Sequence, residues 1–389
     1  MPLRTTLIGV VLAATALIPL QGTALASPNN AAPSATSRSA ASQSAAPPAS
    51  SVAGIEDATA RALAASLDDT AWNRQVRSAA LAGDSVDLRA LTSGSTTATG
   101  KHLAPRVATA DRDVAAAKGL GADIGSLLRL GLANASMEAA LARGEAPLVA
   151  AAPSDDDATF TAYDSRGTAH ELAIDTVPDQ PVYVVDVDGE KAVTEGLKVI
   201  DNTLNAKGLY VPAPASKVEA AAPLAAAGFD TTLINSVRLS DDEEPWVKGD
   251  AEIFTLVTGF GLDGKVRVDT VQMPYLNNDG TTYYPNQILV NWSNYKYNLA
   301  DVVMMEDDGD TNYQALATAL VTALLTITDQ GTYIPLVNAL LDAIPTSWWT
   351  DDPDYVDSWY TLAKTSQGTL NGAAGNGWMN VSPYYVSGL

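Results

Sequence analysis

The sequence predicts a multidomain α+β protein with a helical N-terminal region, a small α+β unit and a C-terminal antiparallel β-sandwich that contains an inserted helical hairpin. Its 389 residues suffice for two or three domains. The spacing of apolar residues changes along the chain from the helical period to the alternation of strands. From residue 229 onward the chain holds six of its seven Trp and 11 of its 14 Tyr, large side chains that suit the core between two sheets.

Residues 1–26 have the anatomy of a secretory signal peptide. Arg4 supplies the positive end, LIGVVLAATALIPL the apolar stretch, and Ala24-Leu25-Ala26 the cleavage site of small residues. The apolar stretch is shorter than the roughly 20 residues that a membrane-spanning helix needs. We therefore expect a secreted protein, extracellular or at the cell surface, with no membrane span in the mature chain.

Residues 27–54 consist mostly of Ala, Ser and Pro and contain almost no large apolar side chain. Such a segment cannot bury enough surface to fold, so we expect a disordered tether. Residues 55–150 are rich in Ala, with apolar residues at helical spacing. They predict a helical region, with one helix starting near Ile55 and another from Asp123 to Leu141.

Residues 157–212 change character and predict a small α+β unit. The segment TFTAYDSRGTAHELAI predicts a hairpin, PVYVVDVDG a strand, and EKAVTEGLKVIDNTLNAKG a helix that Gly208 ends. The Ala- and Pro-rich residues 213–228 predict a linker between this unit and the C-terminal sandwich.

Residues 229–389 predict the acidic, aromatic-rich β-sandwich, because short β-patterned runs recur here between turn signals. Between the fifth and sixth runs, apolar residues at helical spacing predict a helical hairpin at 311–344. Its helices are too short to span a bilayer, so we expect core packing rather than membrane insertion. The seven runs are 231–240, 251–259, 265–273, 286–292, 299–306, 357–364 and 378–386.

The charge balance and the scarce Cys and His limit the possible partners and chemistry. With 45 acidic and 23 basic residues, the formal net charge is −22. This charge disfavours nucleic acid and anionic membranes, since both would be repelled. The chain has no Cys and only two His, His102 and His170, so neither disulfides nor a zinc site of Cys and His in the C-terminal region is expected.

The acids of the C-terminal region gather in a few loops. In an up-and-down sandwich alternate connections lie at the same end, which places the loops 241–250 and 306–312 side by side. Crowded carboxylates destabilise a fold unless a cation neutralises them, and calcium takes roughly six to eight oxygen ligands from flexible loops. The alternative is that water solvates ordinary exposed loops. The predicted calcium ligands are Asp241, Asp242, Glu243, Asp250, Asp307, Asp308, Asp310 and Asn312.

The strongest single pattern is DGDTN at 308–312, an alternation of oxygen ligands typical of calcium loops. It is not an EF-hand, because Tyr313 stands where Gly is required and the twelfth residue is Ala319. A second interpretation gives Asp310 a structural role as the cap of a helix beginning at Thr311.

No sequence pattern identifies a catalytic residue. G-x-S-x-G is absent, no His lies beyond residue 229, and His170-Glu171 lacks the second His of a zinc-protease helix because Ile174 occupies that position. A pair of carboxylates could still hydrolyse a polysaccharide, although no spacing selects an acid and a nucleophile.

Three segments, EEPWVKGDAEIF, PYLNNDGTTYYPNQILVNW and DDPDYVDSWYTL, resemble an exported bacterial family known only as domain of unknown function 3103. The resemblance covers about residues 55 to 389 and is firmest from residue 229 on. It implies an exported protein, and it implies neither a reaction nor catalytic residues.

Together these observations predict an exported, calcium-binding protein that serves as a binding or adhesive module for a glycan or a cell-surface protein. No catalytic residue and no residue for an organic cofactor is assigned. The alternative is a carboxylate-based hydrolase of polysaccharide whose N-terminal regions form a pro-segment. A third interpretation is a structural protein without a ligand.

Overall fold

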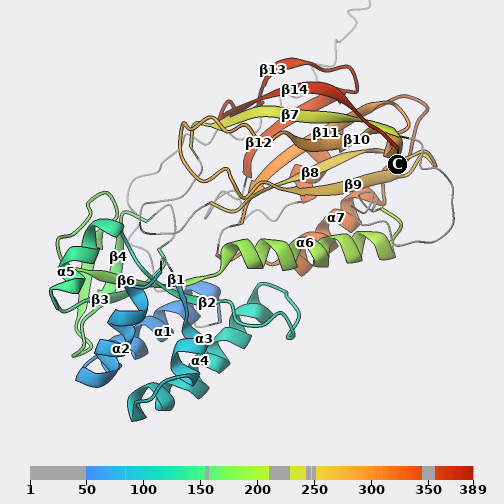
Figure 1. The fold of residues 1–389 in the computed structure, drawn as a ribbon. Coiled ribbons are helices and arrows are strands. Elements are labelled where there is room, and N and C mark those ends of the chain that lie inside the picture. Colours follow the sequence, from blue (N-terminus) through green and yellow to red (C-terminus); the bar gives the residue numbers. More distant parts are fainter. Residues whose placement is uncertain are drawn as a thin grey trace, which may run out of the picture.

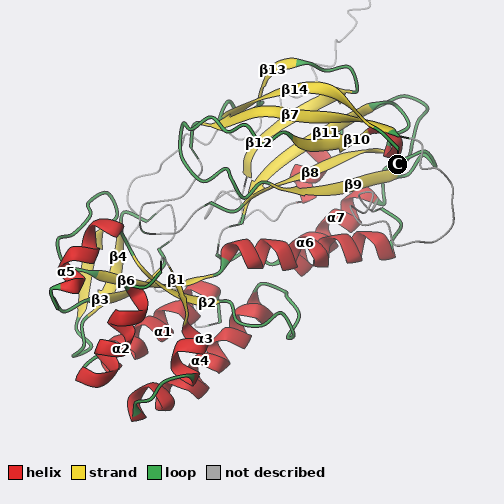
Figure 2. Ribbon diagram, viewed as in Figure 1, coloured by secondary structure: helices red, strands yellow, loops and turns green. Residues whose placement is uncertain are grey.

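A computed structural model describes residues 50–83, 85–153, 157–209, 228–241, 247, 251–307, 309–343 and 355–388. In this part of the chain the protein is a mixed α+β structure whose helices lie mainly in the N-terminal half (Figure 1). Figure 2 shows the strands gathered in sheets at two places, and the helices between and beside them. The coarse fold class, α+β with several antiparallel sheets, is therefore confirmed.

The N-terminal half, up to residue 209, combines helices with short strands. Its elements are α1 (Val52–Ser66), α2 (Thr70–Ala80), β1 (Ser85–Asp87), α3 (Leu88–Ser93), α4 (Ala98–Ala117), β2 (Leu128–Leu132), a 3-10 turn (Ala135–Met137), α5 (Glu138–Ala142), β3 (Leu148–Ala151), β4 (Thr159–Tyr163), β5 (Ala169–Ala173), β6 (Val182–Val187) and α6 (Gly189–Ala206).

The six strands of this half form one sheet, the N-terminal sheet, in the order β1-β2-β6-β3-β4-β5. All neighbours are antiparallel except β3 and β6. The predicted hairpin is confirmed as β4 and β5, the predicted strand as β6 and the predicted helix as α6. Asp188 caps α6 by accepting a hydrogen bond from Lys191 N–H, and Gly208 follows its end at φ +69°, a conformation that glycine adopts without strain.

The C-terminal half is built mainly of antiparallel strands with two helices inserted between them. Its elements are β7 (Phe229–Leu239), β8 (Ile253–Phe260), β9 (Val266–Gln272), β10 (Gln287–Asn291), a 3-10 turn (Trp292–Asn294), β11 (Leu299–Glu306), α7 (Tyr313–Leu324), α8 (Val337–Ala343), β12 (Tyr355–Ala363), β13 (Gly368–Asn371) and β14 (Gly377–Val386).

These strands form two four-stranded sheets. The open sheet has the order β10-β7-β14-β13, and the helix-covered sheet has the order β12-β11-β8-β9. Buried apolar side chains from both sheets, among them Val237, Val257 and Met379, form one core between them. The other face of the helix-covered sheet packs through Phe254 and Val268 into a second core, which includes α6 and α7 (Figure 1).

The second core contains side chains from both sides of residues 213–228, the segment that the sequence analysis interprets as a linker and most of which lies outside the described residues. It joins side chains of α1 and α4, such as Val52 and Val114, to side chains of α7 and of the helix-covered sheet. A third, smaller core packs Val247 from the acidic loop against strands of the N-terminal sheet. The two halves are therefore in contact through buried apolar surface on both sides of that sheet.

Two expectations about the arrangement are wrong. Asp123 to Leu141 is not one helix, because β2 occupies its middle with Leu128 and Leu130 alternating into the core. The strand order is not up-and-down, because β7 pairs with β10 and β14 rather than with β8. Alternation of apolar residues shows which side chains face a core but not which strands pair. The 55–150 segment also contributes three strands, β1 to β3, that the helical interpretation omits.

Candidate functional site

The strand ends that flank the predicted calcium loops meet at one end of the helix-covered sheet. β8 begins beside the end of β11, where Ile253 pairs with Glu306. The backbone N–H of Asp307 donates to the carbonyl of Glu252 at 3.2 Å. The proximity of these loop ends therefore holds although the predicted strand order does not, because antiparallel pairing alternates ends in either arrangement.

Half of the predicted calcium ligands belong to the described part of the chain. Asp241 lies at the end of β7, where its backbone N–H donates to Asn376 Oδ1 at 3.0 Å and its carbonyl accepts from Asn376 Nδ2 at 2.9 Å. Asp307, Asp310 and Asn312 follow β11. The remaining four, Asp242, Glu243, Asp250 and Asp308, lie outside the described residues.

Asp307 forms a buried ion pair with Lys118, the residue that ends α4. Lys118 Nζ lies 3.0 Å from Asp307 Oδ1 and donates to the carbonyl of Gly309 at 2.9 Å. Both side chains are only 1% exposed. An isolated charge at such depth is strongly unfavourable, so each group is tolerated because the other is present. Lys118 also places a cation at a helix C-terminus, where the helix dipole favours it.

Asp310 and Asn312 hold the ends of helices from both halves. Asp310 Oδ1 accepts from the backbone N–H of Val52, the first residue of α1, at 3.0 Å. Asn312 caps α7 by accepting from Ala315 N–H at 2.9 Å, and its Nδ2 donates to the carbonyl of Ala117 at 2.6 Å. The interpretation of Asp310 as the cap of its own helix is therefore wrong: α7 begins at Tyr313 and Asn312 is its cap.

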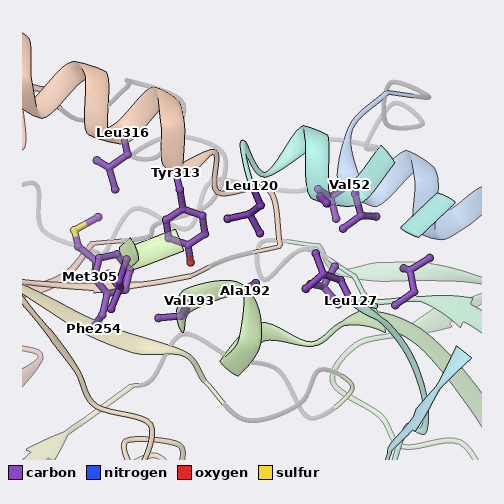
Figure 3. Packing of buried hydrophobic residues seen from close by; sticks show 14 of the residues in the cluster. Val52, Leu120, Leu127, Ala192, Val193, Phe254, Met305, Tyr313 and Leu316 are labelled. Atoms are coloured by element: carbon purple, nitrogen blue, oxygen red, sulfur yellow. The ribbon is translucent and has the colours of Figure 1, made fainter. Parts of the chain in front are cut away.

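Tyr313 completes this junction from the inside. Figure 3 shows its ring among Leu120, Val193 and Leu316, which come from three separate segments of the chain. The ring lies so close to α6 that a Cβ at Gly196 would approach its atoms to 2.3 Å, so this position requires glycine. Burial, followed by the nearby carboxylate of Asp307, raises the pKa of Tyr313 well above its usual value, and the phenol stays neutral.

These contacts give three of the predicted ligands structural partners in the protein itself. Among the residues that the structure describes, no group of three or more His, Cys, Asp or Glu side chains is placed to hold a metal ion. Calcium binding stays a prediction, and an ion at this end would depend mainly on the four acids outside the described part. The acids that stood out in the sequence lie at a junction between the two halves. In the described residues they form an ion pair and bind the ends of helices.

Three other buried carboxylates, Asp111, Asp301 and Asp357, also have structural partners. Each accepts hydrogen bonds from backbone N–H groups of a neighbouring loop, which fixes that loop and stabilises the carboxylate. For Asp301 and Asp357, burial raises the pKa while those N–H groups oppose the rise. The bonds include Leu127 N to Asp111 Oδ1 at 2.7 Å, Thr361 N to Asp301 Oδ1 at 2.6 Å, and Gly377 N to Asp357 Oδ2 at 2.8 Å.

Asp269 differs from these carboxylates in its hydrogen bonding and in its pKa. It lies on β9 opposite Val257 and is 7% exposed. Its Oδ1 accepts from the backbone N–H of Thr270 at 3.0 Å. Burial, with a smaller contribution from the charge of Asp201, raises the pKa of Asp269 to about 7. Its charge also acts on the buried phenol of Tyr295. The hydrogen bond from the neutral Thr270 N–H does not offset the cost of burial, so the pKa of Asp269 lies near neutrality.

A different surface is formed by the open sheet on the side away from the core. Alternate residues of β14 point to this side, and neighbouring strands add polar groups beside them. No helix among the described residues lies over it (Figure 1). We define the open face by six residues whose side chains share this side: Asn235, Thr369, Trp378, Asn380, Ser382 and Tyr384.

Hydrogen bonds connect the polar residues of the open face across three strands. Asn235 Nδ2 donates to Asn380 Oδ1 at 3.2 Å, and Asn380 Nδ2 donates to Thr369 Oγ1 at 3.1 Å. Ser382 Oγ donates to Asn235 Oδ1 at 3.1 Å. Such bonds orient the amides and leave part of their hydrogen-bonding capacity to the solvent side.

An open groove of about 880 Å³ lies elsewhere, along α7. Its lining consists mainly of Ala and Thr side chains, such as Ala315, Thr318 and Thr322, with one carboxylate, Asp342. Among its described lining residues there is one carboxylate, and therefore no pair of carboxylates for general acid and base chemistry.

Comparison with known protein families identifies the family of this chain. A family model described as Protein of unknown function (DUF3103) matches residues 58–388. The chain belongs to this family. Comparison with curated proteins and with solved structures finds no match. Membership in DUF3103 confirms the resemblance found in the sequence, and the family description assigns no reaction, ligand or site.

Sequence reasoning missed two parts of these sites. Lys118 carries no signal in the sequence, because a single Lys at the end of an Ala-rich helix is usually exposed. The open face does have a signal: WMNVSPYY at 378–385 alternates apolar Met379 and Val381 with polar and aromatic residues. The partners of that strand, on β7 and β13, are not indicated by the alternation.

Proposed function

We propose that this DUF3103 protein is an exported, non-catalytic binding protein whose interaction surface is the open face. The observation that supports the proposal is the contrast between the outer sides of the two C-terminal sheets. Helices cover the side of the helix-covered sheet with buried apolar residues. The open sheet instead presents amides, hydroxyls and aromatic rings, with Tyr384 50% exposed.

Export is part of this proposal and rests on the sequence of residues 1–26. In the described part of the chain, no helix is long and apolar enough to cross a membrane. The C-terminal half is interpreted as a β-sandwich with α7 and α8 inserted between β11 and β12. In that arrangement the helix-covered side attaches the N-terminal half, and the open face is left for a partner.

Hydrolysis of polysaccharide is the second candidate, and it has weaker support. Asp111, Asp301 and Asp357 accept backbone N–H donors, and Asp307 pairs with Lys118. These contacts suit loop anchoring rather than proton transfer to a substrate. Asp269 has a raised pKa, as a general acid needs, but it is 7% exposed and faces Val257 of the adjoining strand rather than a groove.

The test is retention measured together with turnover. The full chain without residues 1–26 is passed over immobilised polysaccharides, neutral and anionic, and over a bare matrix, and reducing ends are followed in the same samples. Retention above the bare matrix with a constant amount of reducing ends supports a binding protein. A steady rise in reducing ends overturns the proposal in favour of the hydrolase. Elution from every matrix with the void volume overturns it in favour of a structural protein.

A further inference from the structure

We propose that the open face binds a neutral polysaccharide in an extended conformation, with the glycan chain lying along β14. This inference rests on the proposed function and adds the chemical class of the partner, its direction and the residues that contact it. Three features of the described structure support it: the shape of the row along β14, the hydrogen-bonding groups beside it, and the absence of carboxylates from it.

The row along β14 is long enough for several sugar units. Trp378, Asn380, Ser382 and Tyr384 alternate with Met379 and Val381, which are 0% and 1% exposed in the core. Residues two apart on a strand are about 6.8 Å apart, so the two aromatic rings lie about 20 Å apart along β14. A row of this length fits an extended chain better than a single small molecule.

The ends of the row carry the aromatic side chains. Trp378 sits between Arg238 of β7 and Asn371 of β13 in the sheet register. Tyr384 is 50% exposed at the other end. Aromatic rings combine an apolar face with a polar edge, so they can pack against the C–H face of a pyranose while neighbouring groups bind its hydroxyls.

The middle of the row carries groups that match sugar hydroxyls. The amides of Asn235 and Asn380 and the hydroxyls of Thr369 and Ser382 each include both donors and acceptors. The cross-strand bonds at 3.1–3.2 Å use one or two of these positions on each side chain. The remaining donor and acceptor positions can bind the hydroxyl groups of a sugar, which are themselves both donors and acceptors. The bonds also hold the amides in place, which lowers the entropy lost on binding.

The charge of the face selects a neutral partner. The chain has a net charge of −22, yet none of the six residues of the open face is ionisable below the pKa of Tyr. Arg238 shares this side of the sheet, and its Nε donates to the carbonyl of Gly280 at 2.7 Å. A polyanion would meet repulsion from the protein as a whole, and a polycation would find no carboxylate on the face. A neutral glycan avoids both penalties.

The same face is poorly suited to a second copy of the chain. Stable dimer interfaces bury a largely apolar centre, whereas the centre of this face is the hydrogen-bonded group Asn235, Asn380 and Ser382. Its larger apolar side chains lie toward the two ends, with Trp378 at one end and Tyr384 and the partly exposed Ile288 of β10 toward the other.

The experiment is affinity electrophoresis in native gels that contain a neutral polysaccharide (a soluble β-glucan, a xylan or dextran) or an anionic one (alginate or polygalacturonate). The full chain is compared with Trp378→Ala, Tyr384→Ala and Asn380→Ala. The matched control is Tyr385→Ala: this ring is 56% exposed and adjacent in sequence, but strand alternation points it away from the row. Unfolding midpoints in urea verify that each variant folds.

We expect retardation by at least one neutral polysaccharide, with dissociation constants about tenfold weaker in Trp378→Ala and Tyr384→Ala and changed less than about twofold in Tyr385→Ala. Binding that is equally weakened by Tyr385→Ala, or that is unaffected by all three row variants, would overturn the assignment of the face. Retardation by anionic gels alone would overturn the neutral class while leaving a binding protein. A dimer that Trp378→Ala dissociates would overturn the glycan as the occupant.

Discussion

The two sheets of the C-terminal half use their outer sides in different ways. The helix-covered sheet buries Phe254, Val268 and Met305 against α6 and α7. The open sheet exposes a row of amides, hydroxyls and aromatic rings on β14. Both sheets pack apolar side chains into the same core between them. One side is thus specialised for holding the chain together, and the other is available for a partner.

The comparison also explains where the charges lie. On the covered side, Lys118 and Asp307 are both 1% exposed and neutralise each other. On the open side, none of the six residues of the open face carries a charge. The exposed ion pair between Lys364, which follows β12, and Asp230 of β7 joins the two sheets instead. A charge on the covered side therefore matters for stability, whereas substitutions on the open side should matter for binding.

The largest expected effect comes from breaking the buried pair. Lys118→Met leaves the carboxylate of Asp307 buried without a cation, so the free energy of unfolding should fall by about 3–5 kcal/mol. Urea unfolding followed by Trp fluorescence measures it. The matched control is Lys364→Met, whose partner and environment are solvent-exposed, with an expected loss of less than about 1 kcal/mol. Equal losses in the two variants would contradict the expected difference between a buried and an exposed ion pair.

A second prediction concerns the core between the sheets. The pKa of Asp269 is about 7 in the folded chain and about 3.9 in an unfolded one. Between these values the folded state holds a proton that the unfolded state has lost, so this group lowers stability as the pH rises from 4 to 7. Asp269→Asn should therefore be more stable than the parent by up to about 4 kcal/mol at pH 8 and similar to it at pH 4.

Urea unfolding of both proteins across that pH range measures the difference. Two groups on other elements interact with Asp269: the charge of Asp201 on α6 adds to the rise in its pKa, and the buried phenol of Tyr295, whose own pKa is raised well above its usual value, stays neutral. A difference between the two proteins that does not change with pH would show that the carboxyl keeps an ordinary pKa.

A third prediction concerns calcium binding at the end of the helix-covered sheet where the loop 241–250 ends and the loop 306–312 begins. Binding to the folded state alone would stabilise it by about 2.7 kcal/mol at a hundredfold excess over Kd. Melting curves in EDTA and in millimolar calcium measure this shift, with magnesium as the control for ionic strength and divalent charge. The same melting temperature in all three solutions would contradict calcium binding and favour the alternative that water solvates these loops.

The smallest effect is expected at the N-terminus of α1. Asp310→Ala removes the acceptor for Val52 N–H and should lower the free energy of unfolding by about 1 kcal/mol. Asp310→Asn keeps an acceptor oxygen and loses only the charge near the helix end, so its loss should be about half as large. If Asn were as harmful as Ala, the charge rather than the hydrogen bond would hold α1.

Much of the local structure could be predicted from the sequence. The run 299–306 matches β11, and the apolar spacing of 311–344 locates α7 and α8. Strong local patterns of this kind are sufficient because each element buries one face. β2 was missed since a five-residue run with three Leu fits a helix or a strand equally well.

For each contact at the junction, the sequence indicated only one of the two residues. Asp307 and Asp310 stood out as crowded acids, but their partners, Lys118 and Val52, lie 189 and 258 positions away. Nothing local in the chain indicates such a pairing. The sequence predicted that a cation neutralises Asp307. In the described structure the side chain of Lys118 supplies a positive charge there.

Lys118 also has a consequence for how the chain folds. Its partner is 189 positions later, so the core that joins α1 and α4 to α7 cannot close until most of the chain is available. Contacts of such long sequence separation slow folding, since loop closure precedes any gain from burial. A fragment that stops before β11 would retain Lys118 without its counter-charge. The N-terminal half should therefore fold late, together with the strands that complete it, although it is the first half to be synthesised.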